Sequence, residues 1–236
     1  MKEIRNTLLQ KEAVKYYAYN FYTPTGSSSN PKRILDDWRI SFHGGLSYRV
    51  AETSPQLNSF EREYINELKS GHHFGLDGTY FLNNIFGLGL QGNLFKSSHS
   101  VVAMGHTTSG TMATGLLFDN ISILFIGPQV KMRFLKTSTM NGFLIGGSIG
   151  YIKYTDNGGF ITPAKLESET LGLNSDFDYD YRLSKSLSFG AGLSIKLGVL
   201  SSFTLTQGNQ VQTIELDPDT YESLLRIDLS IGIRFH

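Results

Sequence analysis

Hydrophobic and polar residues alternate with a period of two in eight segments of the chain, beginning at Trp38. In the last segment, Leu, Ile or Phe occupies every second position from Leu225 to Phe235, with Arg, Asp, Ser or Gly between them. Successive side chains of a β-strand point to opposite faces, so this pattern predicts strands with one apolar and one polar face. The eight segments are 39–50, 74–82, 85–95, 125–134, 143–151, 171–183, 187–199 and 225–235.

The connections between these segments alternate in length. Short turns follow the second, fourth and sixth segments, at 83–84, 137–141 and 184–186. Long connections follow the first, third, fifth and seventh, at 52–71, 99–119, 155–168 and 202–220. Short turns on one rim and long loops on the other are typical of outer-membrane barrels, whose short turns are periplasmic. An even number of strands then predicts that both chain ends are periplasmic.

The composition of the two faces indicates which one lies inside. The polar face is mostly Gly and Ser with a few long charged residues, whereas the apolar face is almost entirely Leu, Ile, Val, Phe and Tyr. Eight strands enclose just enough room for side chains, and a closed ring leaves no unpaired backbone edge in lipid. Residues 38–236 are therefore predicted to form an all-β, eight-stranded, antiparallel up-and-down transmembrane β-barrel with the polar face inside.

Aromatic residues near the strand ends are predicted to lie at the membrane–water interfaces, where such rings are enriched. Pro128 lies inside a predicted strand, where proline removes a ladder hydrogen bond, so a bulge or local irregularity is expected near Gly127 and Pro128. The predicted interface aromatics are Trp38, Tyr48, Phe134, Phe143, Tyr151, Tyr181 and Phe235.

Charged residues of both signs fall on the predicted inner face. Because buried charges must be paired, we expect them to form a salt-bridge network that fills the lumen, rather than a conducting pore or ligand site. Eight strands also leave too little bore for a porin channel. The predicted network consists of Arg39, Arg49, Asp77, Lys131, Arg133, Asp176, Asp178, Asp180, Arg182, Lys196, Arg226, Asp228 and Arg234.

The first long connection contains a predicted helix. Asn58 and Glu61 have the spacing of a reciprocal N-terminal cap, and Gly71 is expected to close the helix. Phe60, Tyr64 and Leu68 share one helical face, and we expect them to serve as an interaction surface of this loop.

Residues 1–37 differ in character from the barrel. The spacing of Ile4, Leu8, Val14 and Tyr17 indicates an amphipathic helix, and a Ser-, Pro- and Gly-containing linker follows. We expect this segment to be a periplasmic extension. Its beginning has no continuous apolar core and is not expected to be a signal peptide.

Composition narrows the classes of function. The chain of 236 residues has 21 basic and 21 acidic residues, so no nucleic-acid partner is expected. It has no cysteine, which excludes disulfides, thiolate metal sites and a cysteine nucleophile. The mean hydropathy is −0.15, and no apolar stretch is long enough for a transmembrane helix. Alternating strands average to such a neutral value.

The alternation, the loop asymmetry and the ending LSIGIRFH together resemble small eight-stranded outer-membrane proteins of the OmpX/OmpA transmembrane type. Residues 38–236 are also similar to the "outer membrane protein beta-barrel" families of Bacteroidota. The C-terminal assembly signal of such proteins usually ends on an aromatic residue, whereas here His236 follows Phe235. The resemblance implies insertion by the outer-membrane assembly machinery and implies no reaction.

Three other patterns have residue types found in metal sites or catalytic sites. Asp176, Asp178 and Asp180 have strand spacing, without the glycine turn and distal glutamate of a calcium loop. Adjacent His72 and His73 point to opposite faces, so rim histidines are not expected to bind zinc, and no metal or other cofactor is predicted. Lipid A deacylases carry a His-x-Ser-Asn motif, and His99-Ser100 does not have that spacing.

We therefore predict a non-enzymatic surface or scaffold protein that acts through its extracellular loops. The alternatives are a lipid A-modifying enzyme that uses a rim histidine, and an accessory subunit of a larger outer-membrane complex docked through residues 1–37. The expected partners are outer-membrane lipid and lipopolysaccharide, the assembly machinery, and a protein bound at the loops or the N-terminal segment.

Overall fold

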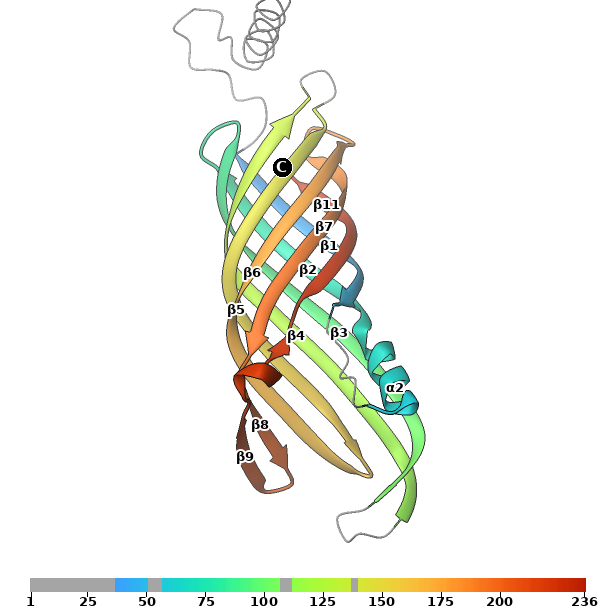
Figure 1. The fold of residues 1–236 in the computed structure, drawn as a ribbon. Helices are drawn as coiled ribbons and strands as arrows, with labels where there is room; N and C mark the ends of the chain where they lie inside the picture. Colours follow the sequence, from blue (N-terminus) through green and yellow to red (C-terminus); the bar gives the residue numbers. More distant parts are fainter. Residues whose placement is uncertain (1–36, 51–56, 107–111, 137–139) are drawn as a thin grey trace, which may run out of the picture. The chain divides into compact units, whose positions relative to one another are not determined.

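The computed structural model describes residues 37–50, 57–106, 112–136 and 140–236. Within these ranges the chain is mostly antiparallel strands (Figure 1). The expected N-terminal extension, apart from Asp37, lies outside the described residues. No helix of the described ranges is long and apolar enough to cross a membrane.

Eight strands form a closed ring in which each strand pairs with the next, and the ring closes through β7 and β11 to β1. This confirms the predicted eight-stranded antiparallel barrel. The strands of the ring are Trp38–Arg49 (β1), Ser70–Phe81 (β2), Phe86–His106 (β3), Met112–Leu135 (β4), Gly142–Phe160 (β5), Thr162–Arg182 (β6), Leu187–Leu200 (β7) and Arg226–Phe235 (β11).

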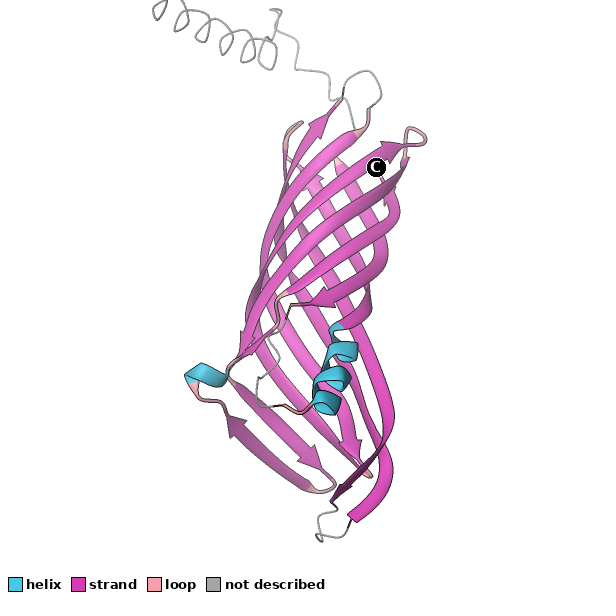
Figure 2. Ribbon diagram, turned by 45° about the vertical axis from the view of Figure 1, so that its right-hand side comes forward, coloured by secondary structure: helices cyan, strands magenta, loops and turns pink. Residues whose placement is uncertain are grey.

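Short turns and the C-terminus lie at one end of the barrel, here called the turn end (Figure 1). In the turn between β2 and β3, the Asn83 side-chain oxygen accepts hydrogen bonds from the backbone N–H groups of Ile85 and Phe86, both at 2.8 Å. The opposite end, here called the loop end, carries the helix Ser59–Lys69 (α2) and the hairpin of Ser202–Gln207 (β8) and Gln210–Glu215 (β9) (Figure 2).

The predicted long loops are mainly strands. β3 and β4 stay paired out to His106 and Met112, and β5 and β6 stay paired up to Phe160 and Thr162. β8 pairs with β6, and a single 3-10 turn, Pro218–Thr220 (η1), and the two-residue strand Glu222–Ser223 (β10) complete the last connection. The long connections are therefore at the predicted end of the barrel, and much of their length is paired strand, because backbone pairing continues where the strict alternation of side chains ends.

Helix α2 begins as predicted and ends differently. The Asn58 side chain accepts a hydrogen bond from the Glu61 backbone N–H at 2.9 Å, and the Glu61 carboxylate accepts one from the Asn58 backbone N–H at 3.0 Å. The helix ends at Lys69, and β2 starts at Ser70, so Gly71 lies in a strand rather than closing the helix. Pairing of Ser47 with Gly71 draws this residue into the sheet instead.

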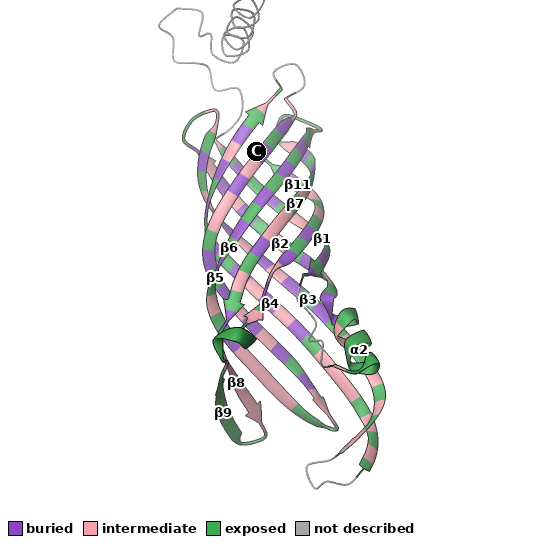
Figure 3. Cartoon of the chain, in the orientation of Figure 1, coloured by how far each residue is buried: buried purple, intermediate pink, exposed green. Residues whose placement is uncertain are grey.

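Exposed and buried side chains alternate along the strands of the ring (Figure 3). Leu46, Leu90 and Leu171 are among the exposed apolar residues, whereas Arg39 and Arg234 of the opposite parity have no exposed surface. A water-soluble protein does not leave so continuous an apolar belt in contact with water. The structure therefore turns the apolar face outward, as a transmembrane barrel requires.

Pro128 interrupts one ladder without shifting it. Ile126 pairs with Tyr151 and Gln129 pairs with Ser148, and between them Gly127 and Pro128 have no partner in β5. The register is the same on both sides of the gap, so the irregularity is a local loss of pairing and not a bulge. Proline has no N–H to donate, which explains the gap.

Candidate functional site

The lumen near the turn end is filled by a group of charges around Arg39, here called the turn-end cluster. Arg39 Nη1 lies 2.9 Å from Asp77 Oδ1, and Arg39 Nε lies 2.8 Å from Asp180 Oδ2. The guanidinium therefore bridges β2 and β6, which lie across the lumen from one another. The cluster comprises Arg39, Asp77, Lys131, Asp176, Asp178, Asp180 and Arg234.

Lys131 is the second cation of the turn-end cluster. Its Nζ lies 2.9 Å from Asp178, 3.1 Å from Asp176 and 3.3 Å from Asp77. The three aspartates considered as a calcium loop thus face the ammonium and guanidinium groups of their own barrel. Opposite charges at these distances, inside a wall that excludes water, hold one another in the ionised form.

Glycine on the inner face makes room for these long side chains. A Cβ on Gly190 would lie 2.5 Å from the guanidinium carbon of Arg234. Arg234 donates from Nη1 to the Gly190 carbonyl oxygen at 2.9 Å and lies 3.3 Å from Asp180. The glycine content of the polar face is therefore a packing requirement of a narrow lumen that contains arginine.

A second group of charges, here called the mid-barrel cluster, surrounds Asp228. Asp228 Oδ1 lies 2.8 Å from Arg226 Nε, and Asp228 Oδ2 lies 2.8 Å from Lys196 Nζ. Arg226 Nη2 also donates to Asn93 Oδ1 at 2.6 Å. The guanidinium carbon of Arg226 lies 4.8 Å from the centre of the Phe95 ring, where the charges meet an apolar layer.

Ser47, His73 and Asp228 have the residue types of a nucleophilic triad but not its hydrogen bonds. Ser47 Oγ donates to Asp228 Oδ1 at 2.6 Å and lies 2.8 Å from His73 Nδ1. A hydroxyl that donates to the carboxylate uses its oxygen to accept from His73, whereas a triad serine donates to its histidine. All three side chains are buried in the wall of the lumen. The arrangement is a structural hydrogen-bond chain.

The remaining predicted lumen residues lie toward the two ends. Arg133 lies over the Phe81 ring at 3.7 Å, and its Nε donates to the Asn84 carbonyl oxygen at the turn end. Arg182 is half-buried at the same end. Arg49 lies near the loop end and forms a 2.6 Å ion pair with Glu222.

An apolar layer, here called the apolar plug, lies inside the barrel on the loop-end side of the mid-barrel cluster. Phe95 and Leu200 have no exposed surface, and Phe125 and Ile152 have almost none. The members of the apolar plug are Tyr64, Leu68, Phe95, Ile121, Ile123, Phe125, Ile152, Tyr154, Leu200 and Leu224.

Helix α2 contributes two members of the apolar plug, which corrects one prediction. Tyr64 and Leu68 are each only 7% exposed, whereas Phe60 is 43% exposed. Tyr64 and Leu68 pack against the chain's own strands, because the inner face becomes apolar at this level and covers them. Of the three residues expected to form an interaction surface, Phe60 alone is exposed.

Carboxylates at the loop end hold α2 in place. The Tyr64 hydroxyl donates to Asp119 Oδ2 at 2.8 Å, and burial raises the pKa of Asp119, although this hydrogen bond opposes the rise. Asp156 accepts a hydrogen bond from the Asn120 backbone N–H at 3.1 Å. Burial, reinforced by the neighbouring charge of Asp119, raises the pKa of Asp156 to about 6.

The raised pKa of Asp156 gives the loop end a pH dependence. Since the folded state binds this proton more tightly than the unfolded state, the contribution of Asp156 to stability is highest below about pH 4 and falls as pH rises to about 6.

Asp156→Asn keeps the acceptor for Asn120 and removes the charge. We expect it to stabilise the β4–β5 extension at pH 7 by about 1 kcal/mol, a value reduced from the full shift because water screens this position. Hydrogen exchange of the Asn120 amide between pH 4 and 7 measures the effect, and equal pH dependence in wild type and variant would contradict it. Asp217→Asn, on a different segment, is the control.

The histidines considered as a rim site lie apart. His73 faces the lumen, and its ring centre is 6.1 Å from that of His43, whereas His72 is exposed. His99 packs edge-on against the Tyr64 ring at 5.1 Å. In the described part of the chain, no three His, Cys, Asp or Glu side chains are grouped so that they could hold a metal ion.

The predicted interface aromatics are all exposed on the outer face. At the turn end, the ring centres of Trp38 and Tyr80 are 4.9 Å apart, and those of Phe42 and Phe235 are 6.3 Å apart. Beyond Tyr151, the outer face of β5 and β6 becomes polar, with Lys153 lying 3.6 Å from Glu167. This change from apolar to charged residues limits the apolar belt on the loop side.

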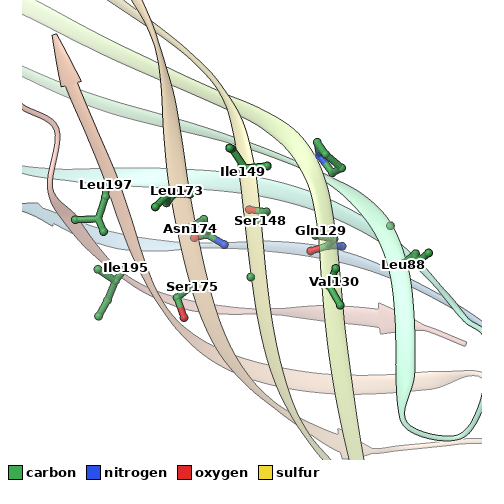
Figure 4. Close-up of a pocket in the computed structure, with 13 residues that line it drawn as sticks. Leu88, Gln129, Val130, Ser148, Ile149, Leu173, Asn174, Ser175, Ile195 and Leu197 are labelled. Atoms are coloured by element: carbon green, nitrogen blue, oxygen red, sulfur yellow. The ribbon is translucent and has the colours of Figure 1, made fainter.

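A groove of about 870 Å³ crosses β3 to β7 on the outer face (Figure 4). Its floor lies where Gly147 pairs with Ser175, two small residues in a row otherwise made of larger ones. Leu88, Val130 and Ile195 complete that row. None of the described residues that line the groove is charged, and most of its surface is apolar.

Sequence reasoning missed the apolar plug and the buried trio of Ser47, His73 and Asp228. A signal for the plug was present in runs such as Ile121 to Ile126, where both strand faces are apolar rather than one. A strand that is apolar on both faces is covered on both faces, which here means lipid outside and a core inside.

Comparison with known proteins supports the fold. No protein-family model and no curated protein matches the chain. Among solved structures, the chain is similar to the outer membrane protein OprG from Pseudomonas aeruginosa, at 12% identity and a TM-score of 0.55, covering 85% of this chain and 96% of that one. It is also similar to Neisserial surface protein A, at 12% identity and a TM-score of 0.51, covering 85% of this chain and 97% of that one. At this level of identity, the shared property is the fold of small outer-membrane β-barrels.

Proposed function

We propose that this chain is a closed outer-membrane barrel that acts as a surface interaction protein through its loop end. The observation that carries the proposal is the filled lumen. Arg39, Arg234 and Thr79 have no exposed surface at the turn end, and neither Phe95 nor Leu200 has any in the apolar plug. Two successive layers of residues without exposed surface support a lumen that is closed to solutes.

The layers differ in chemistry, and each one closes the lumen by its own mechanism. In the charged layers, every displaced ion pair would leave a charge buried without its partner, which costs several kcal/mol. In the apolar plug, an ion would lose its hydration without compensation. Opening a conduit would require disruption of both, so closure is the stable state of the barrel.

A non-enzymatic role is supported by what surrounds the candidate nucleophile. Ser47 is buried and donates a hydrogen bond to Asp228, and the lateral groove has no titratable side chain among its described lining residues. A lipid-modifying enzyme needs a base and a nucleophile that a lipid can reach. The loop end, in contrast, extends the sheet well beyond the apolar belt and displays both its faces.

The orientation that fits this role places the turn end, and with it both chain ends, in the periplasm. Short turns are the periplasmic feature of such barrels. The apolar belt contacts outer-membrane lipid, and the charged residues beyond Tyr151, including Lys153 and Glu167, lie at the level of lipopolysaccharide headgroups. The extended β3–β4 and β5–β6 hairpins and the β8–β9 hairpin then face the exterior.

Planar-bilayer recording tests whether the barrel is closed. Purified protein, shown to be folded by its heat-modifiable gel mobility and inserted by co-flotation with vesicles, is expected to add no discrete conductance steps. Tyr64→Ala thins the apolar plug but leaves both charge clusters, so it is expected to be equally silent. Steps whose frequency increases with the amount of inserted wild-type protein would overturn the closed barrel.

A further inference from the structure

Strand β9 is the last strand of the sheet and has a free edge. β8 pairs with β6 through Thr204 to Thr206 and with all of β9, but β9 has no second neighbour among the described residues. All six residues of β9, Gln210–Glu215, are exposed. β9 therefore presents one side of its backbone to the surroundings.

The register shows which backbone groups are free. β8 and β9 are joined by the two-residue turn Gly208–Asn209, with Gly208 at φ +59°, so Gln207 and Gln210 flank the turn as a pair. In such a hairpin, the flanking pair exchanges both hydrogen bonds, and every second pair does the same. Val211, Thr213 and Glu215 consequently direct their N–H and C=O groups away from β8.

Nothing in β9 protects this edge. Natural sheets shield their edge strands with proline, lysine, a bulge or a covering segment. The sequence QVQTIE contains neither proline nor lysine, and its register with β8 is continuous over six pairs. Val211 is 68% exposed, and Ile214 lies on the other face beside Phe203. An unshielded edge that exposes Val211 is a template for one more strand.

The connection that holds this edge is acidic. Residues 201–225 contain Glu215, Asp217, Asp219 and Glu222 and no lysine or arginine. Glu222 is paired with Arg49, whereas Glu215, Asp217 and Asp219 are exposed. A second copy of this chain would bring two acidic segments together, which disfavours self-pairing through β9. A basic strand would meet opposite charge.

We propose that β9 binds an extended, basic segment of a partner polypeptide as an additional β-strand. The proposal rests on the proposed function, because it assigns the loop-end interaction to one edge. Backbone hydrogen bonds to Val211, Thr213 and Glu215 supply the strand pairing. Alternate apolar residues of the partner pack beside Val211 or Ile214, and its basic residues approach Glu215 and Asp217.

Three synthetic octapeptides test this on the full chain in zwitterionic lipid nanodiscs. The first alternates Lys and Val, the second alternates Glu and Val, and the third is the Lys–Val peptide N-methylated at alternate amides. We expect the first to bind, with an affinity that falls as salt rises, and the other two to bind at least ten-fold more weakly. Equal binding of the acidic or the N-methylated peptide, or no binding of the first, would overturn the proposal.

Two substitutions at one position locate the site. Thr213→Pro removes an edge N–H that β8 does not use, so the hairpin is retained while binding is expected to fall at least ten-fold. Thr213→Val keeps the N–H and is expected to bind as wild type. Binding that is unaffected by Thr213→Pro, in protein with unchanged heat-modifiable mobility, would exclude β9 and leave the closed barrel untouched. Conductance in the bilayer experiment would instead overturn the closed barrel and leave the edge site standing.

Discussion

Replacement of Arg39 by methionine is expected to destabilise the barrel by about 3–5 kcal/mol, because it removes one partner from a buried charge network. Arg39 is fully buried and contacts Asp77, Asp178 and Asp180 at 2.9, 3.6 and 2.8 Å. Methionine fills much of the same volume, so the loss reports the uncompensated carboxylates rather than a cavity. The urea midpoint of heat-modifiable gel mobility in vesicles measures it.

The double variant Arg39→Met with Asp180→Asn separates charge from volume. If unpaired carboxylate is the cause, removal of the nearest one is expected to restore part of the lost stability. Lys153→Met is the matched control, since Lys153 is 42% exposed and its ion pairs with Glu167 and Glu169 are long. Such surface pairs contribute about 0–1 kcal/mol. A loss no larger in Arg39→Met than in Lys153→Met would contradict the network.

The barrel itself was predictable because period-two alternation is a local property. Whether Leu46 faces lipid or Arg39 faces the lumen depends only on parity along one strand. The same reasoning placed Asn58 and Glu61 as a helix cap, since both residues lie within one turn. Local sequence rules therefore predicted the eight strands, their two faces and the start of α2.

The pairing of charges across the lumen was beyond such rules. Arg39 and Asp180 are 141 residues apart, and they meet only because ring closure and strand register bring β1 and β6 to the same height. A two-residue shift in register, the smallest that keeps the same face inside, would assign Arg39 a different carboxylate. Parity predicts that these charged residues face the lumen, but it does not predict which of them form ion pairs.

The height of a residue along the barrel axis was the second property that parity could not predict. Phe95 has the same parity as Asn93 and Gln91, yet it lies in the apolar plug while they lie in a polar layer. Tyr64 and Leu68 follow this change, because an apolar inner face is what draws α2 onto the barrel. The sequence does not give the height at which the inner face changes from polar to apolar. A helix such as α2, with one apolar side, is then predicted to be an interaction surface rather than part of the core.

Replacement of Leu90 by arginine is expected to lower the free energy of unfolding by about 2–4 kcal/mol. A loss of this size would show that lipid, and not water, surrounds the outer face of the barrel. Leu90 is 66% exposed in the middle of the apolar part of β3, between Phe86 and Leu94, and it pairs with Gly78 and Pro128. In a barrel surrounded by lipid, a charge at mid-depth is costly and the penalty falls toward the interfaces. In a barrel surrounded by water, an exposed leucine can become arginine at almost no cost, and solubility would improve.

Val102→Arg provides the depth control on the same strand and the same face. Val102 is 68% exposed, as open as Leu90, but it lies beyond Lys96, Ser98 and Ser100, outside the apolar belt. We expect it to change the free energy of unfolding, obtained from urea titration in vesicles, by less than about 0.5 kcal/mol. The two positions share strand, face and exposure, and they differ in depth and in pairing, since Leu90 pairs with β2 and β4 whereas Val102 pairs with β4. A much larger loss at Leu90, the more firmly paired position, is therefore expected from lipid at mid-depth. Equal and small effects at both positions would contradict a lipid-facing outer surface. The exposed leucines would then be in water, and the burial of arginine and aspartate in the lumen would have no explanation.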